Sequence, residues 1–227
     1  KEYRRQRQMC IRDRRMVASL RNVSDDLAQA VADKLGMALP DALPRALREV
    51  PQPEVEQSPT LSLTARPGEM GVATRKVAIL VAEGVDGAAV STVAQALIKA
   101  GVVVRLVGQR IGPVATADGG SLDADASLDN HPSGLFDGAV VPAGAAAAQR
   151  WREDGRALEF IRDGYRHGKT LLAVGEGADV LQAAGIDLSL DDDGLITGDA
   201  PAKTAAAFID SLARHRHPQR ETDPARI

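Results

Sequence analysis

The residues best placed for chemistry form a sharp turn, Gly175-Glu176-Gly177, between an apolar run and a helical pattern. In α/β enzymes a strand–turn–helix of this kind exposes a nucleophile beside backbone N–H donors at the start of the helix. Gly175 stands at the tip and has no side chain that could attack a substrate. Glu176 is the remaining candidate, as a general base or as a capping carboxylate, and we expect the capping or solvated role.

The sequence matches two phosphate-binding motifs only in part. The turn at Gly175 lacks the third small residue of a dinucleotide fingerprint, because Val180 stands in that place. The sequence Gly168-Lys169-Thr170 ends like a P-loop, but Asp163 replaces the leading glycine and a strand follows instead of a helix. Both motifs are therefore absent.

The possible metal ligands are poorly spaced. His215 and His217, with Glu221 nearby, stand two residues apart at a predicted helix end, so their side chains would point in different directions. The run Asp191-Asp192-Asp193 lacks the spacing of an EF-hand and is typical of a solvated turn. We expect no metal site at either place.

Alternating strands and helices must position these turns. Continuous apolar runs rich in β-branched residues predict buried parallel strands, and helical patterns separate them. The predicted strands are 76–82, 102–108, 136–142 and 169–175, and the predicted helices are 87–101, 155–168, 177–185 and 200–217. Short strands are predicted around an Asp-Gly-Gly turn in 111–125, and a hairpin in 188–198.

This order predicts an α/β domain over residues 75–217, with a mostly parallel sheet covered by helices on both faces in three layers. Ligands of such sheets bind at the carboxyl ends of the strands. The turns that follow the strands there are Glu83–Asp86, Pro142–Gly144 and Gly175–Gly177.

A smaller helix is predicted within residues 16–36. Ser24 is a suitable N-cap, and Gly36 is a fitting stop. The apolar side chains that fall on one face are Leu27, Ala30, Val31 and Leu35. Nothing close in sequence covers this face, so we expect the helix to dock onto another part of the protein.

Residues 37–74 hold six of the twelve prolines and predict an extended arm or linker, because proline fixes φ and removes a backbone donor. An arm of this length is either mobile or laid along a partner surface. Residues 218–227 are interpreted as a C-terminal tail.

The charge is unevenly distributed. Residues 1–15 hold seven basic and two acidic side chains, whereas the remaining chain holds 21 basic and 29 acidic ones. A basic arm on an acidic body is one hypothesis for nucleic-acid binding. The stretch Met9–Arg14 resembles a translated adapter remnant, and we expect residues 1–15 to be a frayed or foreign end and the natural chain to begin earlier.

Composition excludes several classes of protein. Aromatic residues make up only 3%, which argues against a base-stacking surface. One cysteine, Cys10, excludes a disulfide framework and a cysteine-rich zinc site. The longest apolar runs, about seven residues, are too short to span a membrane, and no signal peptide is apparent. We expect a cytoplasmic protein without a membrane partner.

The chain resembles the carboxy-terminal part of large-subunit haem catalases, of the hydroperoxidase II type. The resemblance covers about residues 16–221, and 21–37 resembles the last helix of the catalase core. The segments that carry it are 21–37, 76–86, 115–128, 131–144 and 208–221. The order and spacing of these segments agree throughout, although no single motif is diagnostic. The arm, 37–74, sits where the interdomain connection of that family lies.

The domain itself is similar to the class I glutamine amidotransferase and PfpI-like superfamily, which implies a flavodoxin-like fold. That superfamily has a nucleophilic cysteine at the position of Gly175, often a histidine at that of Glu176, and a supporting glutamate near Ala89. This chain departs from the pattern at all three places. The resemblance therefore implies a degenerate elbow and cleft at Ala89, Gly175, Glu176 and Gly177, without catalytic, cofactor-binding or metal-binding residues.

The catalase resemblance implies a fragment of an enzyme that disproportionates hydrogen peroxide at a haem, in defence against oxidative stress. The haem residues belong to an upstream domain, so neither Tyr165 nor His131 takes a haem role. The expected partners are the haem domain of the same chain and further copies in a homotetramer, with no nucleic acid. The expected role is structural or access-shaping. The alternative is a free-standing PfpI-like hydrolase or amidotransferase-like protein that uses Glu176.

Overall fold

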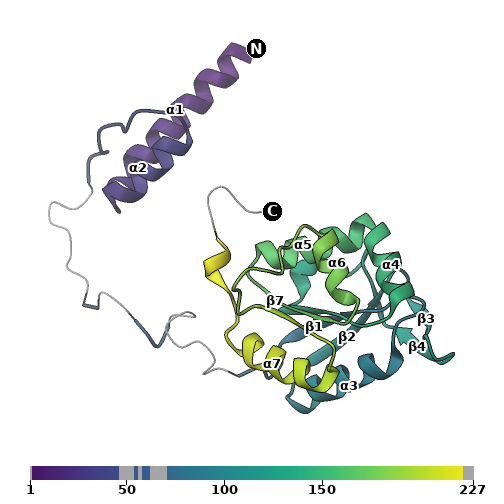
Figure 1. Ribbon diagram of the computed structural model, residues 1–227. Helices are drawn as coiled ribbons and strands as arrows, with labels where there is room; N and C mark the ends of the chain where they lie inside the picture. The colour runs from purple at the N-terminus through teal and green to yellow at the C-terminus, as the bar shows by residue number, and fades with distance from the viewer. Residues whose placement is uncertain (1, 46–53, 56–57, 62–70, 222–227) are drawn as a thin grey trace. The chain divides into compact units, whose positions relative to one another are not determined.

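The computed structural model describes residues 2–45, 54–55, 58–61 and 71–221, with side chains from residue 11 onward (Figure 1). The chain divides into two compact units, Lys1–Gln57 and Ser58–Ile227. Within the described residues, no helix is long and apolar enough to cross a membrane.

The first unit is a pair of helices, α1 (Glu2–Leu20) and α2 (Asp25–Lys34). Ser24 caps α2 as predicted, since its hydroxyl accepts a hydrogen bond from the backbone N–H of Leu27 at 3.2 Å. Gly36 follows the helix with a φ of 64°. Helix α1 extends from residue 2, so residues 2–15, expected as a frayed or foreign end, are continuous with the helix. Their foreign origin stays a prediction.

The face of α2 that packs on α1 differs from the predicted one. Ala28 and Ala32 are buried against Val17, because small side chains let the two helices approach closely. Leu27 and Leu35 remain 46% and 45% exposed. The unit therefore buries a narrow stripe and leaves larger apolar side chains at its surface.

The arm predicted over 37–74 is only partly described. Residues 46–53, 56–57 and 62–70 lie outside the described residues, and with them Pro51, Pro53 and Pro67. The described parts of 37–74 contain no helix or strand. The first of these parts folds back onto α1, where the backbone N–H of Leu43 donates to the carbonyl oxygen of Ala18 at 3.1 Å.

The second unit is built on a six-stranded sheet in the order β5-β2-β1-β6-β7-β8, parallel throughout. The strands are β1 (Lys76–Leu80), β2 (Val103–Gly108), β5 (Ala126–Ser127), β6 (Gly138–Val141), β7 (Thr170–Val174) and β8 (Leu195–Gly198). In the described chain β1, β6 and β7 are buried almost throughout, as expected for strands covered on both faces. A separate antiparallel hairpin, β3 (Gly112–Ala115) and β4 (Ser121–Ala124), confirms the strands predicted around the Asp-Gly-Gly turn.

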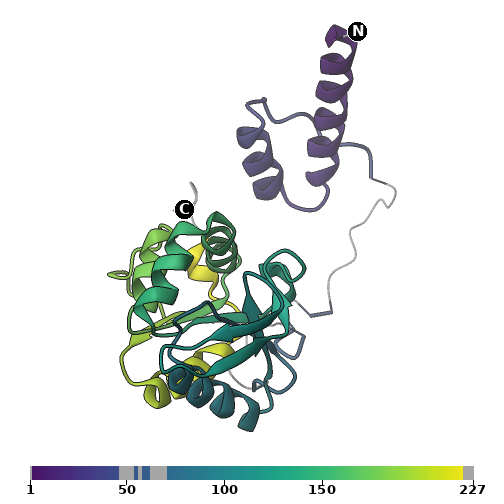
Figure 2. The same cartoon turned by 90° about the vertical axis from the view of Figure 1, so that its right-hand side faces the viewer.

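Helices cover both faces of this sheet, so the predicted three-layer α/β sandwich is confirmed (Figures 1 and 2). Helices α3 (Gly87–Lys99) and α7 (Pro201–Ala213) lie together on one face. The other face carries α4 (Ala145–Glu153), α5 (Gly155–Arg166) and α6 (Gly177–Ala183). Short 3-10 turns, η1 (Ser133–Leu135) and η2 (Pro218–Arg220), complete the domain.

One helix was missed and one prediction about local structure was wrong. Helix α4 was not predicted, although its alanine-rich sequence favours a helix. Residues 188–198 do not form a hairpin, because only Leu195–Gly198 is a strand and it pairs in parallel with β7. The polar stretch before it is needed for contacts with the end of the chain.

The domain also extends past its predicted end at residue 217. Arg220 is buried and forms an ion pair with Asp192 at 2.6 Å, with side chains only 2% and 5% exposed. Its guanidinium also donates to the carbonyl oxygen of Lys169 at 2.6 Å and lies 4.5 Å from the ring centre of Tyr165. Gly194 permits this approach, since a β-carbon there would collide with Arg220. The sequence predicted a solvated turn at Asp192, and this prediction was wrong because the carboxylate is buried.

We predict that Arg220→Met lowers the free energy of unfolding by about 3 kcal/mol or more, because it leaves the Asp192 carboxylate buried without its partner. Arg214→Met is the matched control: Arg214 pairs with Asp193, but both side chains are about half exposed, so its loss should cost less than about 1 kcal/mol. Denaturant unfolding followed by the fluorescence of Trp151, the single tryptophan and a buried one, measures both. Equal losses in the two variants would contradict the assignment.

Candidate functional site

Three turns meet at the carboxyl end of the sheet. They follow β1 (residues 81–86), β6 (142–144) and β7 (175–176). Strands β1 and β6 are neighbours whose following helices, α3 and α4, cover opposite faces (Figure 1). This is the topological switch point, where open α/β sheets bind ligands.

The turn after β7 has the geometry of an elbow. Gly175 adopts a φ of 52°, and α6 begins at Gly177. A β-carbon at residue 177 would collide with the carbonyl oxygen of Val141, so only glycine fits there. A β-carbon at residue 175 would lie 3.2 Å from that of Ala143, which is a tight contact. The elbow therefore presents backbone and no reactive side chain.

Glu176 is exposed and does not cap its own helix. Its carboxylate instead accepts a hydrogen bond at 3.1 Å from the backbone N–H of Gly144, the residue that precedes α4. Hydrogen bonds from its own backbone N–H and from that of Gly144 lower the pKa of Glu176. A carboxylate whose pKa is lowered is a poor general base near neutral pH.

Ala89 lies in the first turn of α3 and is buried. Beside it, Asp86 caps α3, since one carboxylate oxygen accepts from the backbone N–H groups of Ala88 and Ala89 at 2.9 and 3.0 Å. Sequence reasoning missed this role of Asp86, although an aspartate just before a helical pattern is a recognised N-cap signal. The Asp86 side chain is thus engaged by the backbone of α3.

The three turns leave little room between them. The backbone N–H of Asp86 donates to the carbonyl oxygen of Ala143 at 2.9 Å. A β-carbon on Gly144 would lie 2.5 Å from the carbonyl oxygen of Gly84, so the two turns touch backbone to backbone. The predicted elbow residues are brought to one end of the sheet, but packed turns occupy the space between β1 and β6.

An open cleft of about 640 Å³ lies beside these turns. It is bounded by the ends of β1 and β2, the start of the β3–β4 hairpin, and α4 and α5. Its lining residues are Val81, Ala82, Glu83, Gln109, Arg110, Ile111, Pro113, Val114, Asp129, Arg150 and Arg156. Sequence reasoning placed only the Glu83 turn here, because the arginines come from three separate elements.

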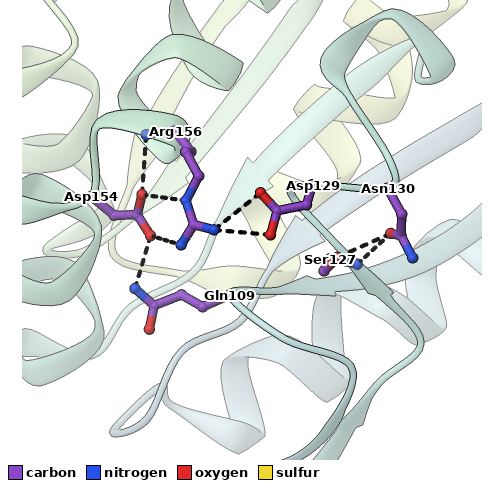
Figure 3. A network of polar contacts seen from close by, with 6 residues as sticks. All are labelled: Gln109, Ser127, Asp129, Asn130, Asp154 and Arg156. Atoms are coloured by element: carbon purple, nitrogen blue, oxygen red, sulfur yellow. Dashed lines mark hydrogen bonds and ion pairs between the residues drawn. The ribbon is translucent and has the colours of Figure 1, made fainter.

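One wall of the cleft is a network of polar contacts (Figure 3). Arg156 lies between two carboxylates, with hydrogen bonds to Asp154 at 2.9 and 3.1 Å and to Asp129 at 3.0 and 3.1 Å. Gln109 donates to Asp154 at 2.9 Å. The hydrogen bonds from Arg156, helped by the one from Gln109, lower the pKa of Asp154 to about 2 despite its burial. Asp154 is therefore ionised at neutral pH.

The histidines at the chain end serve the fold. His217 is 1% exposed, and its Nε2 atom lies 3.1 Å from the Thr170 hydroxyl and 3.2 Å from that of Ser211. His215 follows α7 with a φ of 72° and does not share these partners. Within the described chain, no three histidine, cysteine, aspartate or glutamate side chains group as metal ligands would.

The fold defines the class of protein. Among solved structures, the second unit resembles Drosophila melanogaster DJ-1beta, with a TM-score of 0.58 at 20% identity over 62% of this chain and 91% of that one. A two-domain protein from Anabaena variabilis with DJ-1/ThiJ/PfpI-like and ferritin-like domains gives a TM-score of 0.55 at 24% identity, over 61% of this chain and 48% of that one. The predicted flavodoxin-like, PfpI-like fold is confirmed.

Sequence comparison gives the family. The profile of the C-terminal domain found in long catalases matches residues 73–222. Catalase HPII of Pseudomonas putida is 36% identical over 93% of this chain, and Catalase-2 of Bacillus subtilis is 34% identical over 90%. Both alignments extend beyond the matched domain. The chain belongs to the family of long-catalase C-terminal domains, and it spans 28% of the length of each of these two relatives.

We predict that the free energy of unfolding falls as the pH drops from about 6.5 to 4. Burial, followed by the charge of Arg220, lowers the pKa of His217 to about 4, so the unfolded chain takes up a proton there before the folded one does. The stability from neutral His217 is present above pH 6.5 and is lost as the pH falls through this range, by about 3 kcal/mol. Denaturant unfolding at a series of pH values measures it.

His217→Asn, which keeps a polar side chain, should flatten this part of the pH profile while lowering stability at pH 7. His131→Asn is the control, because His131 is only partly buried, and should leave the slope unchanged. A slope that persisted in His217→Asn would assign the pH dependence to other groups.

We also predict unequal roles for the two carboxylates at the switch point. Asp86→Ala should cost about 1 kcal/mol or more, because it removes the N-cap of α3. Glu176→Ala should cost less than about 1 kcal/mol, because water can replace an exposed carboxylate at the Gly144 N–H. Thermal and denaturant unfolding of the two variants compare them, and a larger loss in Glu176→Ala would reverse this ranking.

Proposed function

We propose that this chain is the carboxy-terminal part of a large-subunit haem catalase and that its role there is structural. The parent enzyme would disproportionate hydrogen peroxide to water and oxygen in the cytoplasm. Membership of the long-catalase family supports the proposal, as do the elbow without a nucleophile at Gly175 and the buried alanine at position 89.

Two buried side chains that could ligate a haem iron, Tyr165 and His217, do not fit that role. Tyr165 is 4% exposed, and the guanidinium of Arg220 covers its ring. His217 is held by the hydroxyls of Thr170 and Ser211. A haem ligand would need an open face beside the iron, which neither side chain has. In this proposal the haem is held by a preceding domain of the parent chain, and no step of peroxide chemistry runs through these residues.

The observation that carries the structural role is the exposed apolar surface of the first unit. Helices α1 and α2 fully bury only Val17, Ala28 and Ala32 between them, and larger side chains such as Leu20 are buried in part. Larger apolar side chains of the unit stay exposed, including Ile11, Met16, Val23, Leu27 and Leu35. Several large apolar side chains exposed on so small a unit favour a contact surface. We propose that it packs on the haem domain of the same chain and that the second unit stabilises the assembled tetramer.

The alternative of a free-standing hydrolase that uses Glu176 is less well supported. Family membership favours the catalase fragment. The Glu176 carboxylate is engaged by the Gly144 N–H, and its pKa is lowered. Neither property suits a general base.

We predict that removing residues 75–227 from the intact parent catalase accelerates thermal inactivation several-fold and promotes dissociation of the oligomer. Turnover per remaining haem should persist, because the deleted part supplies no reacting group. Residual activity after heating and size-exclusion chromatography with light scattering measure the two effects. If both were unchanged by the deletion, the structural role would be excluded.

Substitutions in α2 test the contribution of the first unit independently of the second. Leu27→Asp combined with Leu35→Asp in the intact parent should reproduce the faster inactivation, since it places charge in a buried contact. Gln29→Glu, which adds charge at an exposed position of the same helix, is the control and should behave like the parent.

A further inference from the structure

The cleft beside the switch point has the size and walls of a ligand site. Its volume of about 640 Å³ falls within the range of small-molecule pockets. Two apolar side chains, Ile111 and Pro113, are exposed along one part of it, and Val81, Ala82 and Val114 lie buried behind them. Charged side chains from the turn after β1, the end of β2, α4 and α5 line the rest. Most of the surface that lines the cleft is polar or charged, which favours a charged ligand over an apolar one.

The walls are held in place by backbone contacts. The hairpin that bears Pro113 and Val114 is attached to the turn after β1, because the N–H of Gly84 donates to the carbonyl oxygen of Ala115 at 2.8 Å. The N–H of Ala117 donates to the carbonyl oxygen of Val85 at 2.9 Å. The opposite wall is the Arg156 network. A site built on such supports is preorganised.

The three arginines of the cleft differ in how many hydrogen-bond and ion-pair partners they have. Arg156 is occupied by Asp154 and Asp129. Among the described residues, the Arg150 guanidinium bonds only to Glu83, from Nη2 at 2.6 Å, and both side chains are about half exposed. Arg110 is exposed and makes no hydrogen bond or ion pair with the part of the chain that the structure describes. Guanidinium N–H groups that could bind a ligand therefore come from two separate elements, the turn after β2 and helix α4.

We propose that this cleft binds a small organic dianion, with Arg110 and Arg150 holding its oxygens and with Ile111 and Pro113 against its carbon skeleton. Arginine N–H groups match the planar geometry of carboxylate and phosphate oxygens. A phosphomonoester and a dicarboxylate share this chemistry. Glu83 competes with the ligand for Arg150, since its carboxylate occupies that guanidinium in the free protein. This site is separate from the elbow at Gly175 and does not depend on the catalase proposal.

The test is calorimetric titration of the full chain at low ionic strength, with glycerol 3-phosphate in one arm and succinate in the other. We expect saturable binding of at least one probe, with a dissociation constant of about 1 mM or lower. Arg110→Gln and Arg150→Gln should each weaken it about tenfold or more. Arg105→Gln, at an exposed arginine that pairs with Asp125 outside the cleft, should leave it unchanged.

The variant Glu83→Gln gives the sharpest outcome, because it should strengthen binding several-fold by releasing Arg150. The fluorescence of buried Trp151 reports that each variant is folded. Absence of saturable binding by both probes would overturn the proposal, as would equal weakening by Arg105→Gln and Arg110→Gln. The two arms decide between phosphate and dicarboxylate ligands.

Discussion

At the carboxyl end of the sheet, the turn after β1 and the turn after β6 pack backbone against backbone. Gly84 and Gly144 make this approach possible, since a side chain on either would meet the other turn or the start of α4. The contact joins the two halves of the sheet at the point where the chain reverses its direction of winding. It also decides where the domain can hold a ligand, because turns that touch leave no space between β1 and β6. The open volume lies to one side, over β1 and β2.

Charge in this domain has two different physical roles. Arg220 and Asp192 are withdrawn from water, so each depends on the other and on the surrounding backbone groups. Burial alone would raise the pKa of Asp192, but Arg220 and the Gly194 N–H outweigh it, and the pKa is lowered. Arg150 and Glu83, in contrast, are half exposed, and water screens their attraction. The buried pair holds the chain end on the sheet, while the exposed pair can exchange partners at little cost.

The sequence was informative where periodicity and local signals dominate. The apolar runs located β1, β2, β6 and β7, and the Ser24 cap located α2, because strand burial and helix capping are short-range patterns. The sequence did not reveal the role of residues whose contacts lie far away along the chain. Asp192 has the composition of a solvated turn, and only Arg220, far along the chain, makes it a buried partner. The same holds for the cleft arginines, since no local sequence pattern indicates that Arg110 and Arg150 line one cleft.

The packing around the elbow explains why this fold lacks room for a nucleophile and its substrate. A nucleophile at Gly175 would need space for its substrate, and the packed turns supply none. The same packing makes a rigid body, with a buried strand on each side of the switch point and a chain end locked by Arg220. Rigid domains suit a stabilising role, because contact with a partner then costs little conformational entropy. The first unit has the opposite character, with a small buried stripe and exposed leucines, and gains most from being covered. In the structural role proposed above, the packed domain would supply the stabilising surface and the helical pair would supply the attachment to the parent enzyme.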